Sequence, residues 1–180
     1  SAEYFGFVFD PEKARQLLRE HGGETAGLRK LRLLLAVDGT LRISSEALPE
    51  DASLLRLAIS PVPVDSQDPF RYHKTTRREL LDDARTARTD CDEVLFLNQR
   101  GEVTEGSYHT LVIKQNGLLL TPSLNSGLLP GVLREELLEC GEMTEKVLYP
   151  EDLQRAEELW LINSVRGRRR AALVQGEPLK

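Results

Sequence analysis

Cysteine is scarce in this sequence, and the two residues present, Cys91 and Cys140, stand far apart. Without a paired spacing they offer neither a disulfide framework nor a metal motif, and isolated thiols fit a reducing compartment. No apolar run approaches the ~20 residues that a membrane helix needs, and no signal peptide opens the chain. The formal net charge of −5 argues against nucleic acid or an anionic membrane as the main partner. We therefore expect a cytoplasmic protein with no metal, no nucleic-acid partner and no membrane contact.

The rest of the composition is that of an ordinary globular protein. Hydrophobic residues make up 40% and charged residues 29% of the 180 residues, which suits one ordinary domain or two small ones. Proline and aspartate crowd into residues 61–69, a composition typical of a linker. We therefore expect two domains, residues 1–65 and residues 70–180.

The hydrophobic pattern predicts helices and hairpins in a mixed order. Asp10 and Pro11 are typical of a helix start, and Asp38-Gly39 and Asn116-Gly117 each separate two apolar runs as a hairpin turn does. Helices are expected at 11–21, from Thr75 or Thr76 to Arg88, at 132–138 and at 151–157. Strands are expected at 31–37, 40–44, 54–59, 94–97, 102–104, 110–113, 118–121, 159–162 and 171–174. Hairpins without regular βαβ units favour an α+β fold over a doubly wound sheet.

Lys74 is the first candidate for chemistry. It stands just before a predicted helix, where the positive end of the helix dipole disfavours another cation, and Arg71 and Arg78 are close in sequence. Such surroundings lower the pKa of an amine, which a Schiff-base lysine requires. Taken alone, the simpler interpretation is a solvated lysine in a basic segment.

Glu105 follows the second strand of a predicted hairpin. A carboxylate that faces a bound pyridine nitrogen keeps that nitrogen protonated and makes the ring an electron sink. The alternative is a plain turn glutamate. His73 and His109 have no carboxylate partner at a recognisable spacing, and we expect both to be structural.

Two further segments could bind an anion. Gly131 precedes a predicted helix, so the backbone N–H groups of Val132 and Leu133 could hold a phosphate, although many ordinary helices start in this way. At the end of the predicted strand 159–162, Ser164 could hydrogen-bond a phosphate, and Arg166 could form a fork with a substrate carboxylate. No P-loop, zinc or nucleophile-elbow pattern is present.

The order of these features is more informative than any of them alone. A lysine before a helix is followed by a glutamate in a hairpin, by Thr121-Pro122, by a Gly-Leu-Leu-Pro-Gly-Val-x-Arg loop and by a strand that ends in a small polar pair. This order resembles class-IV enzymes that depend on pyridoxal 5'-phosphate (PLP). They include branched-chain and D-amino-acid aminotransferases and aminodeoxychorismate lyase. The resemblance covers roughly residues 70–175 and, more weakly, residues 1–65.

The resemblance implies a two-domain fold like that of D-amino-acid aminotransferase. Residues 1–65 would form a small α/β domain and residues 70–180 a larger α/β pseudo-barrel domain that binds PLP. Family members carry a His-x-x-Arg-Leu-x-x-Ser-Ala segment in the small domain, and this chain begins at Ser1-Ala2. We therefore expect the small domain to be incomplete at its N-terminus, with the phosphate-binding arginine just before Ser1.

The resemblance also implies a role for each candidate residue. Lys74 would carry PLP as a Schiff base, and Glu105 would pair with the pyridine nitrogen. The expected phosphate-binding residues are Gly131, Val132, Leu133 and Ser164. The expected substrate-binding residues are Arg78, Asn163 and Arg166.

Within the family, two segments look most like the lyase domain fused behind aminodeoxychorismate synthase component I. They are His-Lys-Thr-Thr-Arg-Arg at 73–78 and Asn-Ser-Val-Arg-Gly at 163–167. The Gly-Gly-Asn-Tyr stretch typical of branched-chain aminotransferases is absent after Lys74. The resemblance therefore implies a homodimeric lyase of folate synthesis that acts on a small molecule, fused to or paired with the synthase. A class-IV aminotransferase and a non-catalytic domain of a fused synthase are the alternatives.

Overall fold

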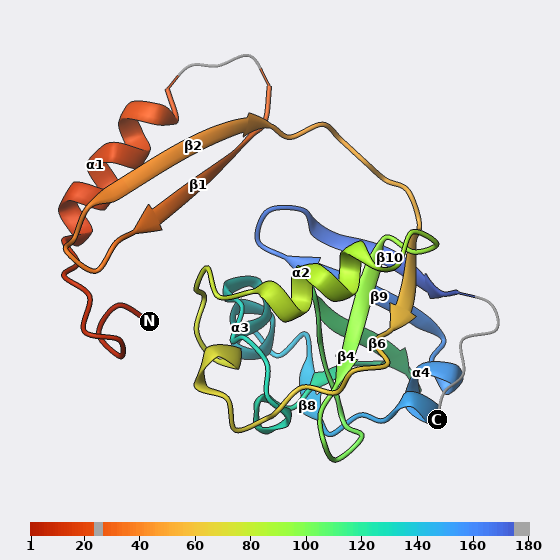
Figure 1. The fold of residues 1–180 in the computed structure, drawn as a ribbon. Coiled ribbons are helices and arrows are strands. Elements are labelled where there is room, and N and C mark those ends of the chain that lie inside the picture. Colours follow the sequence, from red (N-terminus) through yellow and green to blue (C-terminus); the bar gives the residue numbers. More distant parts are fainter. Residues whose placement is uncertain (24–26, 175–180) are drawn as a thin grey trace. The chain divides into compact units, whose positions relative to one another are not determined.

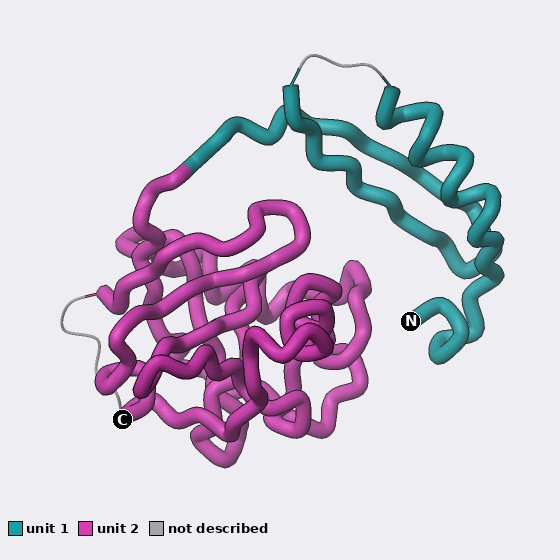
Figure 2. The backbone as a smooth tube through the Cα atoms, turned by 180° about the vertical axis from the view of Figure 1, so that it is seen from behind, with its two compact units in different colours: residues 1–51 teal, residues 52–180 magenta. Residues whose placement is uncertain are grey.

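The chain forms two compact units in the computed structural model, Ser1–Asp51 and Ala52–Lys180, which Figure 2 shows in different colours. The structure describes residues 1–23 and 27–174. In the first unit, helix α1 (Pro11–His21) packs against a two-stranded sheet of β1 (Arg29–Leu35) and β2 (Leu41–Ala47). The Asp10 carboxylate caps α1 by accepting the backbone N–H groups of Glu12 and Lys13 at 2.9 and 3.1 Å.

The hairpin predicted at Asp38-Gly39 is confirmed. Leu35 pairs with Leu41 across the turn, and the Asp38 carboxylate accepts the Thr40 N–H at 2.9 Å. Gly39 has a φ of +86°, and an added Cβ would lie 3.2 Å from Val8. Only glycine meets both conditions without strain, so the turn depends on this residue.

The second unit contains an eight-stranded sheet in the order β5-β4-β3-β10-β9-β6-β7-β8 (Figure 1). Its strands are β3 (Leu55–Ile59), β4 (Glu93–Leu97), β5 (Val103–Gly106), β6 (Thr110–Gln115), β7 (Leu118–Pro122), β8 (Thr144–Lys146), β9 (Glu158–Asn163) and β10 (Gly167–Leu173). The expected hairpins β4–β5 and β6–β7 are present, and three pairs of strands are parallel: β3–β4, β3–β10 and β7–β8. The short strand β8 had no signal in the sequence.

Strand β3 lies inside the large sheet, although the expected boundary at residues 61–69 placed it in the small domain. The chain divides at Asp51 and Ala52 instead. The reason is that β3 pairs in parallel with both β4 and β10, and that Leu57 and Ala58 on this strand are fully buried. The proline-rich segment 61–69 is thus a crossing within the large unit.

The large sheet curls, so that its edge strand β5 approaches segments beyond its paired neighbour. The Val103 N–H donates to the Leu148 carbonyl at 2.8 Å, and the Gly106 N–H donates to the His109 carbonyl at 2.8 Å. The curl encloses a core of buried aliphatic residues, among them Leu95, and helix α4 (Pro150–Arg155) contributes to it. The other core members are Leu55, Leu57, Val103, Leu111, Ile113, Leu120, Leu148, Leu153, Leu159, Leu161 and Ala171.

Helices α2 (Glu79–Thr86) and α3 (Val132–Glu139) pack against the sheet in two further clusters (Figure 1). Leu81 of α2 lies in a cluster with Val94 and Phe96 of β4. Leu137 of α3 lies in a cluster with strands β6 and β9. Within the described residues, no helix is long and apolar enough to cross a membrane.

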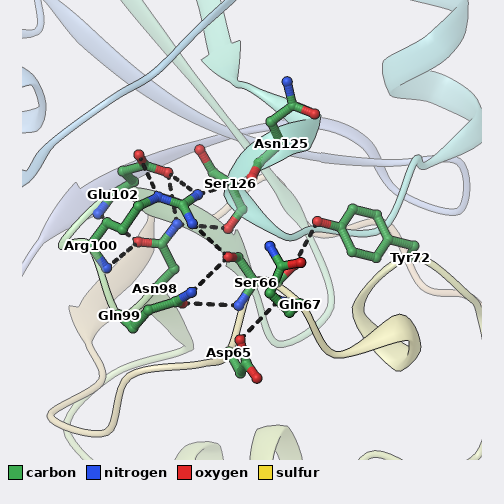
Figure 3. Close-up of polar contacts among 10 residues, drawn as sticks. All are labelled: Asp65, Ser66, Gln67, Tyr72, Asn98, Gln99, Arg100, Glu102, Asn125 and Ser126. Atoms are coloured by element: carbon green, nitrogen blue, oxygen red, sulfur yellow. Dashed lines mark hydrogen bonds and ion pairs between the residues drawn. The ribbon is translucent and has the colours of Figure 1, made fainter.

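Arg100 joins three loops near the start of β5 (Figure 3). Its guanidinium donates to the Glu102 carboxylate at 2.9 and 2.7 Å, to the Ser66 hydroxyl at 2.7 Å and to the Asn125 carbonyl at 3.0 Å. Asn98 reinforces the link with donations to the Glu102 carboxylate at 2.8 Å and to the Ser126 carbonyl at 2.9 Å. The loops before Lys74, before Glu105 and before Gly131 are therefore braced against one another.

Gly127 allows two of these loops to pack closely against each other. It has a φ of +93°, and an added Cβ would lie 2.7 Å from Ser66 Cα, which is closer than real Cβ contacts allow. The loop that leads to α3 therefore packs directly on the backbone of the loop that leads to Lys74.

We expect Gly127→Ala to destabilise the large unit more than Gly117→Ala does. Gly117 also has a positive φ, of +75°, but its Cβ would meet nothing within 4 Å. Gly117→Ala should cost about 1–2 kcal/mol of backbone strain, and Gly127→Ala about 1–3 kcal/mol more because of overpacking. Chemical denaturation of the two variants measures the difference. Equal losses of unfolding free energy would show that the Gly127–Ser66 contact yields easily.

Candidate active site

Lys74 lies in the loop between a short 3₁₀ helix, η1 (Pro69–Arg71), and helix α2. The sequence predicted a helix from Thr75 or Thr76 onward, but α2 begins at Glu79, so Lys74 does not stand at a helix N-terminus. The Thr75 hydroxyl accepts the Arg77 N–H at 3.2 Å, and such a local turn competes with helix formation. The expected effect of the helix dipole on Lys74 is therefore wrong. That basic neighbours lower the pKa of the Lys74 amine stays a prediction.

Glu105 is a buried carboxylate with a raised pKa. Its side chain is only 12% exposed, and Oε1 accepts a hydrogen bond from Arg71 Nη2 at 2.9 Å. Burial raises the pKa of Glu105 to about 7, against the opposing effects of Arg71, the Leu129 backbone N–H, Arg78 and Lys74. Lys74 and Arg78 are thus near enough to Glu105 to act on it electrostatically. The sequence placed Arg71 only among the basic neighbours of Lys74.

The turn between β5 and β6 is held by two residues that the sequence assigned to substrate. Arg78 Nη2 donates to the Ser107 carbonyl at 2.5 Å, and Asn163 Nδ2 donates to the Tyr108 carbonyl at 3.3 Å. The Arg78 guanidinium also lies 4.7 Å from the centre of the Tyr108 ring, within cation–π range. Both residues therefore contact the turn that directly follows Glu105.

A buried polar cluster fixes the same turn from the other side. Glu93 is fully buried and accepts the backbone N–H of Ser107 at 2.8 Å, the Ser107 hydroxyl, and the Tyr108 N–H at 3.2 Å. His109 Nδ1 lies 2.5 Å from the Glu93 carboxylate, a partner 16 residues away that no recognisable spacing indicated, and this contact fits the structural role expected for His109. Although burial acts to raise it, the hydrogen bonds from His109 and Ser107 hold the pKa of Glu93 below its ordinary value.

The start of α3 and the turn after β9 meet, as the expected phosphate site requires. The Leu133 N–H donates to the Ser164 hydroxyl at 3.2 Å. Gly131 precedes the helix with a φ of −70°, and an added Cβ would make only an ordinary contact at 3.6 Å, so the protein's own packing does not demand glycine there. Val132 is 71% exposed, which leaves the first turn of α3 accessible from solvent.

The turn after β9 is fixed by Asn163. Its Oδ1 accepts the backbone N–H groups of Val165 at 3.0 Å and Arg166 at 2.8 Å. Because Asn163 also reaches the Tyr108 carbonyl, this turn and the turn after Glu105 are directly connected. A series of contacts thus connects the region of Lys74 and Glu105 to Ser164 and the start of α3.

The residues present fit PLP. A buried carboxylate suits a protonated ring nitrogen, a lysine amine nearby suits the aldehyde, and the N–H groups at the start of α3 with the Ser164 hydroxyl suit a phosphate. A cavity of about 350 Å³ lies between α3 and strands β6 and β9, and none of these residues lines it. It is lined by Val112, Lys114, Gly117, Leu119, Leu137, Met143, Glu158, Trp160, Ile162 and Arg168.

Comparison with known proteins identifies a family and relatives. The model of the family described as amino-transferase class IV matches residues 1–174. A protein of Schizosaccharomyces pombe named putative aminodeoxychorismate lyase is 29% identical over 175 residues, which cover 92% of this chain and 76% of that protein. A probable branched-chain-amino-acid aminotransferase of Thermotoga maritima is 33% identical over 99 residues, 52% of this chain but only 36% of that protein.

A solved structure extends the likeness to three dimensions. The crystal structure of a putative amino-acid aminotransferase from Mesorhizobium loti is 38% identical, with a TM-score of 0.89 over 96% of this chain and 86% of that one. The expected fold, a small α/β unit with a larger pseudo-barrel unit, is confirmed by this likeness and by the curled sheet.

We expect Glu105→Gln to flatten the pH dependence of stability. The pKa of Glu105 is about 7 in the folded protein against an ordinary value of 4.5, so the folded state holds the proton more strongly than the unfolded state. This contribution is present below about pH 4.5 and is lost as the pH rises towards 7, by about 3 kcal/mol at most. Urea denaturation across this pH range measures it.

Glu102→Gln provides a control, because Glu102 affects the pH dependence of stability with the opposite sign. The Arg100 hydrogen bond chiefly lowers the pKa of Glu102 to about 2, so the stability that this carboxylate adds is present at neutral pH and disappears as the pH falls below its ordinary value. If Glu105→Gln and wild type lose the same unfolding free energy between pH 4.5 and 7, Glu105 does not have a raised pKa.

Proposed function

Because the chain belongs to the class-IV aminotransferase family, a family of PLP-dependent enzymes, we propose that it is a lyase that converts 4-amino-4-deoxychorismate to 4-aminobenzoate and pyruvate. The observation that carries this choice is the S. pombe relative named as a putative lyase, because its match extends over 92% of this chain. The Thermotoga aminotransferase matches only about half of it. The His-Lys-Thr-Thr-Arg-Arg segment at 73–78 supports the same choice.

In this proposal PLP is bound by residues from four segments. Lys74 would hold the cofactor covalently through Nζ, and Glu105 would hold a proton on the ring nitrogen. The N–H groups of Val132 and Leu133, with the Ser164 hydroxyl, would bind the phosphate beside Gly131. When bound, PLP supplies an electron sink for the substrate carbon skeleton.

The protein's own residues would then move protons and hold the substrate. Once the substrate amine has displaced it, the Lys74 amine would take the ring proton of the substrate as a general base. Arg166 would meet a substrate carboxylate. Arg78 and Asn163 would also bind a substrate carboxylate. They would keep their contacts to the turn after Glu105 at the same time, because a guanidinium has five N–H donors and a side-chain amide has two.

The partners belong to the same proposal. We propose a homodimer that is fused to or paired with aminodeoxychorismate synthase, which would supply the aminated substrate of the lyase. The support is the resemblance of segments 73–78 and 163–167 to the lyase domain of such fusions.

An aminotransferase is the second candidate. The observation in its favour is the M. loti structure, titled a putative amino-acid aminotransferase, which is 38% identical over nearly the whole chain. Lys74 and Glu105 would have the same roles in both reactions, so these residues do not distinguish them.

Product analysis distinguishes the two activities. The protein is loaded with PLP and given 4-amino-4-deoxychorismate, and we expect 4-aminobenzoate and pyruvate in equal amounts. In parallel, glutamate and branched-chain amino acids are tested for conversion of PLP to the pyridoxamine form. Conversion without any 4-aminobenzoate would overturn the lyase in favour of the aminotransferase. Failure to bind PLP at all would favour a non-catalytic domain.

We expect Lys74→Ala to lose the absorbance near the visible edge that PLP acquires when a lysine holds it covalently. The control is Lys114→Ala, because Lys114 lies on β6 and its ammonium pairs with Glu158 at 3.4 Å. Titration of both variants with PLP in a spectrophotometer measures the effect. Retention of the band in Lys74→Ala would reject Lys74 as the attachment site.

A further inference from the structure

The salt bridge between Arg71 and Glu105 is buried on both sides. Arg71 is 8% exposed and the Glu105 side chain 12%, with Nη2 and Oε1 2.9 Å apart. Apolar residues of similar volume can often replace a buried ion pair without loss of stability, because both charges must give up their hydration. The pair is therefore poorly explained as a stabilising contact. A function for the charge itself is the better explanation.

The guanidinium of Arg71 is directed to Glu105 from a fixed segment. Its backbone N–H donates to the Asp68 carbonyl at 3.0 Å in η1, and its Cζ lies 5.9 Å from the centre of the Phe96 ring. Its Nε is buried and has no partner among the described residues. The donors of the guanidinium are therefore not all satisfied by the surrounding protein. Glu105 is its one charged partner in the described part of the chain.

The charge of Arg71 acts on the proton of Glu105. Burial favours the neutral carboxyl, and a neutral carboxyl cannot form an ion pair with a protonated ring nitrogen. The nearby cation favours the carboxylate. A carboxylate has about four acceptor positions, and Arg71 and the Leu129 N–H use two of them. Acceptor capacity remains for a third donor.

We propose that Arg71 is a positioning residue that holds Glu105 as an oriented anion, so that the carboxylate can pair with the protonated ring nitrogen of PLP. The inference rests on the proposed function, because PLP is what gives an anionic Glu105 its task. Arg71 would not touch the reacting atoms. Arg71 stands three residues before Lys74. One short segment would therefore supply both the amine that holds PLP and the positive charge that keeps Glu105 ionised.

The cofactor-free protein tests the effect on Glu105 directly. The carboxyl carbons of glutamate are labelled with ¹³C, the Glu105 signal is assigned by its loss in Glu105→Gln, and its pKa is measured by NMR. Arg71→Gln removes the charge but retains a donor, and we expect it to raise the pKa by about one unit or more. Arg71→Lys keeps the charge and should stay within about half a unit of wild type.

Arg77→Gln is the matched control. Arg77 lies in the same segment, but it is exposed and its guanidinium stacks on Phe70 at 4.3 Å. We expect no change in the pKa of Glu105. If Arg71→Gln shifts the pKa no more than Arg77→Gln does, the proposal is overturned. Should Arg71→Gln not fold, a rise of a full unit in Arg71→Lys would contradict a role for the charge.

The loaded protein tests the link to the cofactor. With ¹⁵N-labelled PLP, we expect the ring-nitrogen chemical shift of wild type and Arg71→Lys to be that of a protonated pyridine, and that of Arg71→Gln to move towards the unprotonated value. An unchanged shift in Arg71→Gln would overturn the link. Wild type that binds no PLP would overturn the proposed function and this link, while the cofactor-free titration would still decide whether Arg71 sets the charge of Glu105.

Discussion

Burial of the Glu105 carboxylate at the edge of the curled sheet is the constraint on which the candidate active site depends. A buried carboxylate needs donors, and here they come from Arg71 and the Leu129 N–H. The loop of Arg71 must therefore be held against β5, and the Arg100 brace links the loops that lead to both. The turn after Glu105 is held in turn by Glu93, Arg78 and Asn163. The contacts between these loops therefore hold the Glu105 carboxylate in one place.

Features with local causes could be predicted from the sequence. The hairpin at Asn116-Gly117 has φ angles of 52° and 75°, which these residue types adopt readily, and Asp10 caps α1 as predicted. The start of α2 was predicted wrongly because the turn at Thr75 competes with the helix. The apolar pattern of β3 was recognised, but its place in the large sheet depends on β4 and β10, which lie far along the chain.

The contacts that organise the site could not be read from spacing. Arg71 and Glu105 are 34 residues apart, and Glu93 and His109 are 16 apart. Glu93 and His109 meet because β4 pairs with β5 and the turn after β5 folds back, whereas Arg71 reaches Glu105 from the η1 loop. Nothing near any one of these residues indicates its partner. The resemblance identified Lys74, Glu105 and Ser164 as candidates because family members carry the same features in the same order along the chain. It did not indicate that Arg78 and Asn163 hold the turn between β5 and β6.

Lys74 is the residue that we propose holds PLP covalently. The most direct test is to incubate the protein with PLP, reduce it with borohydride, digest it and locate the pyridoxyl group by mass spectrometry. We expect one modified lysine at low PLP excess, Lys74, and protection of this residue when phosphate competes for the start of α3. Modification spread over the other lysines, with Lys74 no more reactive than Lys30 or Lys114, would contradict it.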